Sequence, residues 1–214
     1  MKYTDILFDL DGTLTDPMMG ITNAVMYALR HFGIEVADRR ELYPFIGPPL
    51  TDSFEKFYGF SHEQALEAVK EYRVYFSDIG LFENEVYDGI PQLLQALTAA
   101  GAHLSVASSK PTVFVERILE HFDLRRYFDT VVGSELGGER VEKEDVIAFV
   151  MQKRHLNSND AVLMVGDRSF DVQGATINGI PAVGVAYGYG ERDEFQGAVY
   201  VADTVADLQT FLLL

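Results

Sequence analysis

Two acidic residues, one position apart, follow directly on a short apolar run near the start of the chain. Asp9 and Asp11 come after the run at residues 6–8 and just before Gly12. An apolar run of this length that ends at an Asp-Gly turn predicts a buried central strand of an α/β sheet. Two carboxylates held at the end of such a strand repel each other and lose hydration, so they require a cation nearby. We therefore expect the reaction centre at residues 9–16.

The chain after residue 88 alternates short apolar runs with helical patterns. We expect strands at 103–107, 128–133, 161–165, 182–186 and 198–201, and helices at 89–100, 111–122, 142–155, 169–178 and 204–214. Strands that alternate with helices indicate a parallel sheet covered on both faces. The fold class predicted is therefore α/β, with a Rossmann-like parallel sheet core and helices on both faces.

Residues 16–85 contain only helical patterns. Asp16 and Pro17 are typical of an N-cap and the first residue of a helix, and further helices are expected to about residue 76. This stretch is predicted to be an inserted α-helical cap domain over residues 16–85. Residues 1–15 and 86–214 then form the catalytic core.

Composition excludes several classes of function. The 214 residues include 33 acidic and 17 basic side chains, a formal charge of −16 that repels nucleic acids and anionic membranes. There is no cysteine, which excludes disulfides and thiolate chemistry. No apolar run reaches the roughly 20 residues that span a bilayer. We expect a cytoplasmic protein, monomeric or homodimeric, that binds neither nucleic acid nor membrane.

Polar residues follow several of the predicted strands. Because ligands of open α/β sheets bind beyond the carboxyl ends of the strands, those ends are where a site is expected. They carry Asp9, Asp11, Ser108, Ser109, Lys110, Asp167 and Asp171. Converging carboxylates without histidine or cysteine favour Mg²⁺ over zinc. Each motif alone is also typical of a solvated turn or a helix cap, but their occurrence at separate strand ends favours a metal site.

Ser108 and Lys143 are candidate phosphate ligands. Ser108 ends a predicted strand just before a helix, where hydroxyl and N–H groups can bind an anion. Lys143 lies in the first turn of a predicted helix, where a cation opposes the helix dipole. The alternative interpretations are that Ser108 only caps the helix and that Lys143 is an ordinary surface lysine. If Lys143 has a binding role, it can neutralise a phosphorylated aspartate.

These segments, in this order, resemble the haloacid dehalogenase superfamily, in particular its phosphatases with a helical cap, such as the phosphoglycolate phosphatase group. The resemblance implies that Asp9 is the nucleophile and Asp11 the general acid and base. It implies phosphate binding near Gly12 and Thr13 and by Ser108, Ser109 and Lys143. Asp9, Asp11 through its backbone carbonyl, Asp167 and Asp171 would hold Mg²⁺.

The function predicted is a magnesium-dependent phosphomonoesterase that hydrolyses small phosphorylated metabolites through an aspartyl phosphate. Among substrates, 2-phosphoglycolate is favoured. The alternatives are a 5′-nucleotidase acting on nucleoside monophosphates, a phosphomutase similar to β-phosphoglucomutase, and a binding protein that retains the fold without catalysis.

Substrate choice is expected to depend on the helical insert. Gly47 and Pro48 lie in a rigid loop between helices that could project toward the active site. Arg73, with tyrosines beside it, could bind a carboxylate or a base on the leaving group. A plain helix joint and a solvated arginine are the alternative interpretations. The glycine-rich stretch at residues 184–190 is expected to line the entrance to the site.

Overall fold

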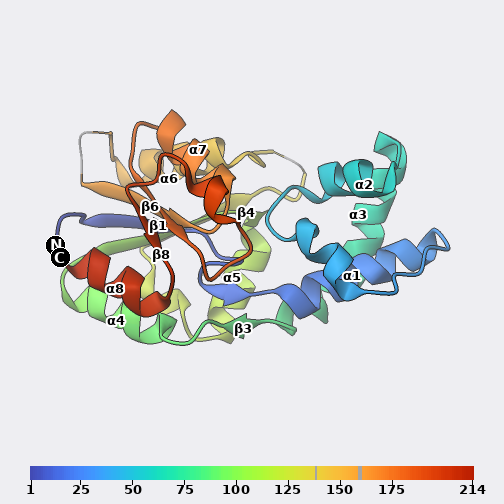
Figure 1. Ribbon diagram of the computed structural model, residues 1–214, viewed down its shortest axis with the longest axis horizontal. Coiled ribbons are helices and arrows are strands. Elements are labelled where there is room, and N and C mark those ends of the chain that lie inside the picture. The colour runs from blue at the N-terminus through green and yellow to red at the C-terminus, as the bar shows by residue number, and fades with distance from the viewer. Residues whose placement is uncertain (138, 159–160) are drawn as a thin grey trace. The chain divides into compact units, whose positions relative to one another are not determined.

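The computed structural model describes residues 1–137, 139–158 and 161–214 (Figure 1). The chain divides into two compact units. The first contains Met1–Asp16 and Val86–Leu214, and the second is Pro17–Glu85. We call them the sheet unit and the helical unit and describe each by itself. Among the described residues, no helix is both long and apolar enough to cross a membrane.

The sheet unit is built on six parallel strands, which confirms the predicted fold class. Their order is β5 (Thr130–Ser134), β4 (His103–Pro111), β1 (Asp5–Phe8), β6 (Val162–Gly166), β7 (Ala182–Val185) and β8 (Tyr200–Ala202). All residues of β1, β6 and β7 are buried. Buried strands of this kind need no polar alternation, since helices cover both faces.

Helices cover the two faces of this sheet. They are α4 (Ile90–Ala99), α5 (Thr112–His121), α6 (Lys143–Arg154), α7 (Ser169–Ile177) and α8 (Val205–Leu213). On one face, Leu7 and Met164 belong to an apolar cluster with Val146 and Val150 of α6 and Val172 of α7. Figure 1 shows α4 and α8, which pack together, on the opposite face. Alternate residues of the strands thus point to opposite helical layers.

The strand register brings three chain segments to one edge of the sheet. Phe8, the last residue of β1, pairs with Val106 of β4 on one side and Val165 of β6 on the other. The residues that follow each of these three therefore lie side by side at the carboxyl edge. This register, together with the central place of β1, is what assembles the candidate site.

The helical unit contains α1 (Met18–His31), η1 (Arg39–Phe45), α2 (Leu50–Tyr58), α3 (His62–Phe76) and η2 (Gly80–Phe82). Phe45 and Phe54 are fully or almost fully buried and stack edge to face. Close approach of α1 to η2 depends on Gly20, since a Cβ atom there would lie 1.9 Å from the carbonyl oxygen of Gly80.

Two local expectations were wrong. Asp16 does not cap α1, which begins at Met18 after Pro17 without a side-chain cap. Asp16 instead lies in β2 (Thr15–Asp16), which pairs with β3 (Glu85–Val86) in a separate two-stranded sheet. Strand β4 was expected to end at residue 107, but it continues to Pro111, with an irregular register against β5 after Ala107. This extension carries residues 108–110 farther along the edge of the sheet than a simple strand end would.

Candidate active site

Three buried carboxylates converge at the carboxyl edge of the sheet. Asp9 follows β1, Asp167 follows β6, and Asp171 lies in the first turn of α7. One carboxylate oxygen from each lies within 4.8 Å of the others, and their exposed fractions are 6%, 1% and 1%. The carboxylates of Asp9, Asp167 and Asp171, which the sequence analysis expects to converge at the strand ends, therefore lie together.

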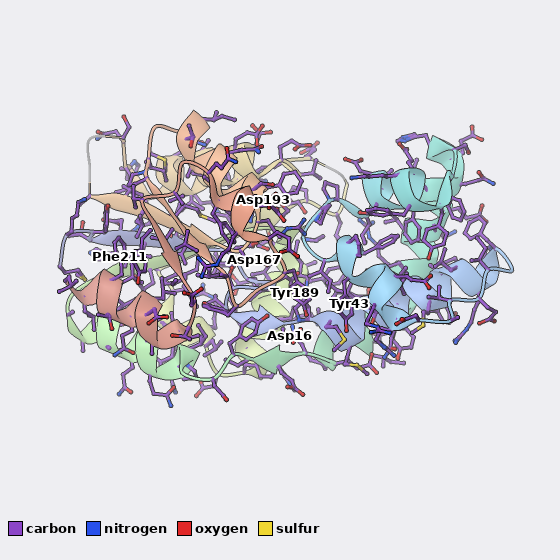
Figure 2. All side chains as sticks on the ribbon, viewed as in Figure 1. Asp16, Tyr43, Asp167, Tyr189, Asp193 and Phe211 are labelled. Atoms are coloured by element: carbon purple, nitrogen blue, oxygen red, sulfur yellow. The ribbon has the colours of Figure 1, made fainter. Side chains whose placement is uncertain are left out.

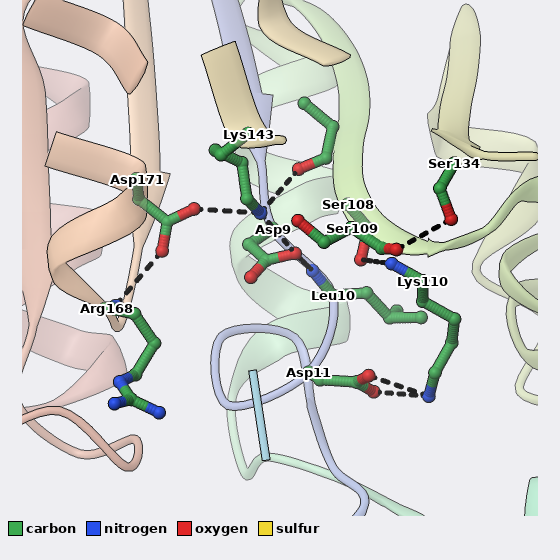
Figure 3. Close-up of polar contacts among 11 residues, drawn as sticks. Asp9, Leu10, Asp11, Ser108, Ser109, Lys110, Ser134, Lys143, Arg168 and Asp171 are labelled. Carbon is green, nitrogen blue, oxygen red and sulfur yellow. Dashed lines mark hydrogen bonds and ion pairs between the residues drawn. The ribbon is translucent and has the colours of Figure 1, made fainter. Parts of the chain in front are cut away.

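Lys143 is the cation of this cluster. Its Nζ lies 3.0 Å from Oδ1 of Asp9 and 2.9 Å from Oδ1 of Asp171, and it donates to the carbonyl oxygen of Ala107 at 3.1 Å (Figure 3). Burial works to lower the pKa of Lys143, but the two carboxylates outweigh it and the net shift is upward. The ammonium group therefore stays charged. Lys143 is the first residue of α6, and its ion pairs with two buried carboxylates compensate for the unfavourable place of a cation at a helix start.

Asp167 has the features of a metal ligand. Its Oδ2 accepts a hydrogen bond from the backbone N–H of Tyr189 at 2.8 Å, whereas its Oδ1 is buried without a hydrogen-bond partner among the described residues. Burial is the main cause that raises the pKa of Asp167 well above its usual value, followed by repulsion from Asp171 and Asp9. A buried, unpaired carboxylate oxygen is costly, and a divalent cation bound by oxygen ligands would satisfy it. The donor set therefore fits Mg²⁺.

Glycines allow the backbone to close around Asp167. Gly12 has a φ of +78°, and a Cβ atom there would lie 2.1 Å from Oδ2 of Asp167. On the other side, Cβ atoms at Gly188 and Gly190 would lie 2.3 Å from the carbonyl oxygen of Gly12 and 1.9 Å from that of Asp167. The glycine-rich stretch after β7, expected only to line an entrance, thus packs directly against a candidate ligand.

Two tyrosines tie this stretch to the loop after β1. The hydroxyl of Tyr187 donates to the carbonyl oxygen of Thr13 at 3.0 Å, and that of Tyr189 donates to Asp16. Figure 2 labels Asp16, Asp167 and Tyr189 on the ribbon. Tyr189 therefore contacts Asp167 through its backbone and Asp16 through its side chain.

Asp11 is paired with a different lysine. Nζ of Lys110 lies 2.8 Å from Oδ1 and 2.7 Å from Oδ2 of Asp11, and these side chains are only 8% and 10% exposed (Figure 3). The pKa of Asp11 is raised because burial outweighs the lowering effect of Lys110. Asp9 and Asp11 thus lie in different electrostatic surroundings, although one residue separates them.

The remaining candidate phosphate ligands lie in different surroundings. Ser108 is buried beside Asp9 and Lys143 in Figure 3, and its Oγ accepts the N–H of Lys110 at 3.3 Å. The carbonyl oxygen of Ser109 accepts a hydrogen bond from Ser134. The amides of Gly12 and Thr13 donate to Thr15 and Leu10 within the loop. Gly12 and Thr13 therefore shape the loop, and phosphate contact by them stays a prediction.

The formal charges of the site residues sum to −2. Asp9, Asp11, Asp167 and Asp171 contribute four negative charges when ionised, and Lys110 and Lys143 two positive ones. One divalent cation would bring the site to neutrality before substrate binds. The strongly acidic chain therefore carries a site at which an anionic phosphate ester need not meet net repulsion.

Comparison with known proteins identifies the family that carries this arrangement. The sequence profile of the haloacid dehalogenase-like hydrolases matches residues 6–185. The chain belongs to this family. The resemblance to this family that the sequence analysis based on the segments around Asp9, Ser108, Lys143 and Asp167 is thereby confirmed.

Three similar proteins span almost all of this chain or most of it. A 5′-nucleotidase of Pseudomonas aeruginosa is 47% identical over 209 residues, 96% of this chain and 94% of that protein. A crystal structure of a predicted phosphatase from Clostridium acetobutylicum has 49% identity and a TM-score of 0.95, covering 99% and 98% of the two chains. The tyrosine-protein kinase PtkA of Mycobacterium tuberculosis is 40% identical over 88% of this chain, but this chain spans only 64% of PtkA.

The protein group favoured by the sequence analysis is more distant. A phosphoglycolate phosphatase of Shigella boydii serotype 4 is 28% identical over 97% of this chain and 92% of that protein. This similarity supports the same family, with less identity than the 5′-nucleotidase has.

The sequence analysis assigned no individual role to two residues that contact the aspartates of this site, Lys110 and Tyr189. Lys110 was noted only as part of a polar strand end, because nothing in the sequence shows that β4 continues past residue 107. A signal was available, since Lys110 follows two serines that were both predicted ligands. Tyr189 acts on Asp167 through its backbone, and side-chain chemistry gives no sign of such a contact.

The specificity candidates Gly47, Pro48 and Arg73 all lie in the helical unit. Gly47 has a φ of +106°, which favours glycine there, and Arg73 lies half-buried on α3. Of the tyrosines beside it, Tyr72 is buried and Tyr75 donates to Glu83 within the unit. The assignment of these three candidates to substrate recognition stays a prediction.

Proposed function

We propose that this chain is a magnesium-dependent phosphomonoesterase that forms an aspartyl phosphate on Asp9. The observation that carries the proposal is the buried cluster of Asp9, Asp167 and Asp171 around Lys143, with Oδ1 of Asp167 left without a hydrogen bond. The family and the names of its members support a phosphatase.

The site has the ligands that a magnesium ion requires. The carboxylates of Asp9, Asp167 and Asp171, with the backbone carbonyl of Asp11, would hold the cation. When bound, Mg²⁺ neutralises charge on the oxygen atoms of the phosphoryl group that is transferred. Tyr189 keeps Oδ2 of Asp167 occupied, so that Oδ1 would be the oxygen available to hold the cation.

Asp9 is the nucleophile in this proposal. Both the backbone N–H of Leu10, at 2.7 Å, and Lys143 contact Oδ1 of Asp9, so we place the attack on Oδ2. The new bond joins this oxygen to phosphorus while the bond from phosphorus to the leaving oxygen breaks. Lys143 and the hydroxyl of Ser108 bind the phosphoryl oxygens, with Ser109 beside them.

Asp11 transfers the protons in both steps. In the first step its carboxyl group donates a proton to the leaving alkoxide, which departs as an alcohol. In the second step the Asp11 carboxylate takes a proton from water as that water attacks phosphorus and the bond between phosphorus and Oδ2 of Asp9 breaks. Inorganic phosphate leaves, and Asp9 and the protonated Asp11 are regenerated. The raised pKa of Asp11 favours this role, because burial keeps it able to carry a proton.

We place nucleoside 5′-monophosphates first among the substrates and 2-phosphoglycolate second. This order reverses the one that the sequence analysis favours, because the 5′-nucleotidase of Pseudomonas aeruginosa is 47% identical and the phosphoglycolate phosphatase only 28%. The substrate expected is a small phosphate ester in either case.

A panel of phosphate esters tests the proposal. Nucleoside 5′-monophosphates, 2-phosphoglycolate and glucose phosphates are assayed with Mg²⁺ and with excess chelator, on the wild type and on Asp9→Asn. The proposal predicts magnesium-dependent release of phosphate and alcohol in equal amounts, lost in Asp9→Asn. Isomerised sugar phosphate without phosphate release would indicate a mutase, and alcohol released in excess of phosphate would indicate transfer to another acceptor. Activity that is unchanged in Asp9→Asn would contradict the proposal.

A further inference from the structure

Lys110 makes a two-point contact with Asp11 that the proposed reaction so far leaves unused. The Nζ atom lies within 2.8 Å of both oxygen atoms of Asp11, and both side chains are at least nine-tenths buried. In water such a pair contributes little, but in a buried site the attraction is stronger and both groups lose hydration. A contact to both oxygens also fixes the rotation of the carboxyl group, which one hydrogen bond would leave free.

The segment that carries Lys110 is itself held rigidly. Beyond Ala107 the register between β4 and β5 shifts. Gly133 of β5 permits this, since a Cβ atom there would lie 2.2 Å from the carbonyl oxygen of Lys110. Ser134 donates to the carbonyl oxygen of Ser109 at 2.8 Å. The ends of β4 and β5 therefore position the lysine backbone directly.

We infer that Lys110 is a positioning residue for proton transfer, which holds the Asp11 carboxyl group toward the leaving oxygen of the substrate. The inference rests on the function proposed above for Asp11. When the proton moves from Asp11 to the leaving alkoxide, negative charge appears on the two oxygens that Lys110 contacts. A fixed cation at that place stabilises the charge without reorganisation during the reaction.

Lys110 and Lys143 are therefore expected to act on different bonds. Lys143 contacts Asp9 and Asp171 and lies where the phosphoryl group is transferred. Lys110 acts on the leaving oxygen through its contact with Asp11. A purely structural ion pair would affect every substrate equally, whereas a residue that supports proton donation affects most those substrates whose leaving group needs the proton.

The test compares leaving groups in one protein. The kcat/KM values of wild type, Lys110→Met, Lys110→Gln and Lys110→Arg are measured for p-nitrophenyl phosphate and for an alkyl phosphate. An aryl oxide leaves readily without a proton, whereas an alkoxide does not. The value of kcat/KM reports the steps up to release of the leaving group. Its ratio between two substrates does not depend on how much of a preparation is folded, and Lys110→Gln serves if the methionine variant does not fold.

We expect Lys110→Met and Lys110→Gln to lose on the order of 10²-fold for the alkyl ester, within the range for a misplaced general acid, and less than about tenfold for the aryl ester. Lys110→Arg, which keeps the cation, should recover part of the difference. The exposed Lys153→Met on α6 should leave both values unchanged. Equal losses for the two esters, or none, would overturn the inference. A wild type that hydrolyses neither ester would instead overturn the proposed function, and the inference with it.

Discussion

The two buried lysines of the site differ in what holds them and in what they contact. Lys143 begins α6 and reaches two carboxylates that come from β1 and α7. Lys110 lies on the irregular end of β4 and contacts both carboxylate oxygens of Asp11. In the proposed reaction, the side of the site near Lys143 binds the metal ion and the phosphoryl group. The side near Lys110 serves the proton transfer proposed for Asp11.

This difference shows how one loop can carry two carboxylates with unlike chemistry. Asp9 and Asp11 are separated by a single residue, and the turn at residues 10–15 sends them to different partners because the amides of residues 13–15 all donate to the carbonyl oxygen of Leu10. The division of labour arises from the neighbours that each carboxylate meets, and not from the residue type.

The largest effect is expected on the side of Lys143. Lys143→Met should lower kcat/KM by roughly 10³-fold or more, since it removes a fixed cation from the phosphoryl group. It should also lower the free energy of unfolding by about 3–5 kcal/mol without Mg²⁺, because buried Asp9 and Asp171 lose their partner. Phosphatase assays and urea unfolding in chelator measure the two effects. The exposed Lys153→Met is the control, and an equal loss in both variants would contradict this account of Lys143.

The next effect tests the proposed metal site through Gly12, a residue that has no functional group of its own. Gly12→Ala places a Cβ atom 2.1 Å from Oδ2 of Asp167 and should weaken Mg²⁺ binding by about 10–100-fold. Gly33→Ala is the matched control, because Gly33 has a similar φ of +72° but no atom within 4 Å of its Cβ position. Calorimetric titration with Mg²⁺ should separate the two variants. If both bind Mg²⁺ like the wild type, Gly12 does not support the ligand.

The third effect depends on pH. Burial, the largest cause, raises the pKa of Asp171 to about 6, although Lys143 works against it. Mg²⁺ requires the ionised form, so protons compete with the cation as pH falls through about 6. The apparent Kd for Mg²⁺ should therefore rise about tenfold between pH 7 and pH 5. Titrations of wild type across this range measure it. A Kd that stays constant, or one that falls toward low pH, would contradict this role for Asp171.

Much of the side of the site near Lys143 is predictable from sequence, because most of its residues follow the ends of strands. An apolar run followed by a polar cluster marks where a parallel strand stops, and parallel strands end at a common edge. Asp9, Asp167, Asp171 and Ser108 were found in this way. Lys143 was noticed because a cation at a helix start opposes the helix dipole, and the structure shows that buried carboxylates compensate for it.

The other side could not be predicted in the same way. Lys110 meets Asp11 across 99 residues of chain, and only because β4 continues irregularly past Ala107. The close approach of Gly188 and Gly190 to Asp167 depends on backbone packing, which the identity of the side chains does not predict. The prediction that Asp16 caps a helix was wrong. An Asp-Pro pair is typical of a helix start, but the carboxylate of Asp16 accepts a hydrogen bond from the hydroxyl of Tyr189 instead.

The smallest effect concerns the helical unit. If Arg73 binds a charged group of the substrate, Arg73→Ala should lower kcat/KM about tenfold for 2-phosphoglycolate, as for one hydrogen bond to a charged group. The value for p-nitrophenyl phosphate, which has no such group, should not change. The exposed Arg40→Ala, in the same unit, is the control. Equal losses for both substrates, or none, would remove Arg73 from substrate recognition.

The most direct test of the division between Asp9 and Asp11 is to detect the phosphorylated enzyme. Wild type, Asp9→Asn and Asp11→Asn are mixed with p-nitrophenyl phosphate and Mg²⁺, quenched in acid and analysed by peptide mass spectrometry. The account predicts one phosphoryl group on Asp9 in the wild type and more of it in Asp11→Asn, whose second step lacks a base. It predicts none in Asp9→Asn. A phosphoryl group on another residue, or none in Asp11→Asn while the wild type turns over, would contradict it.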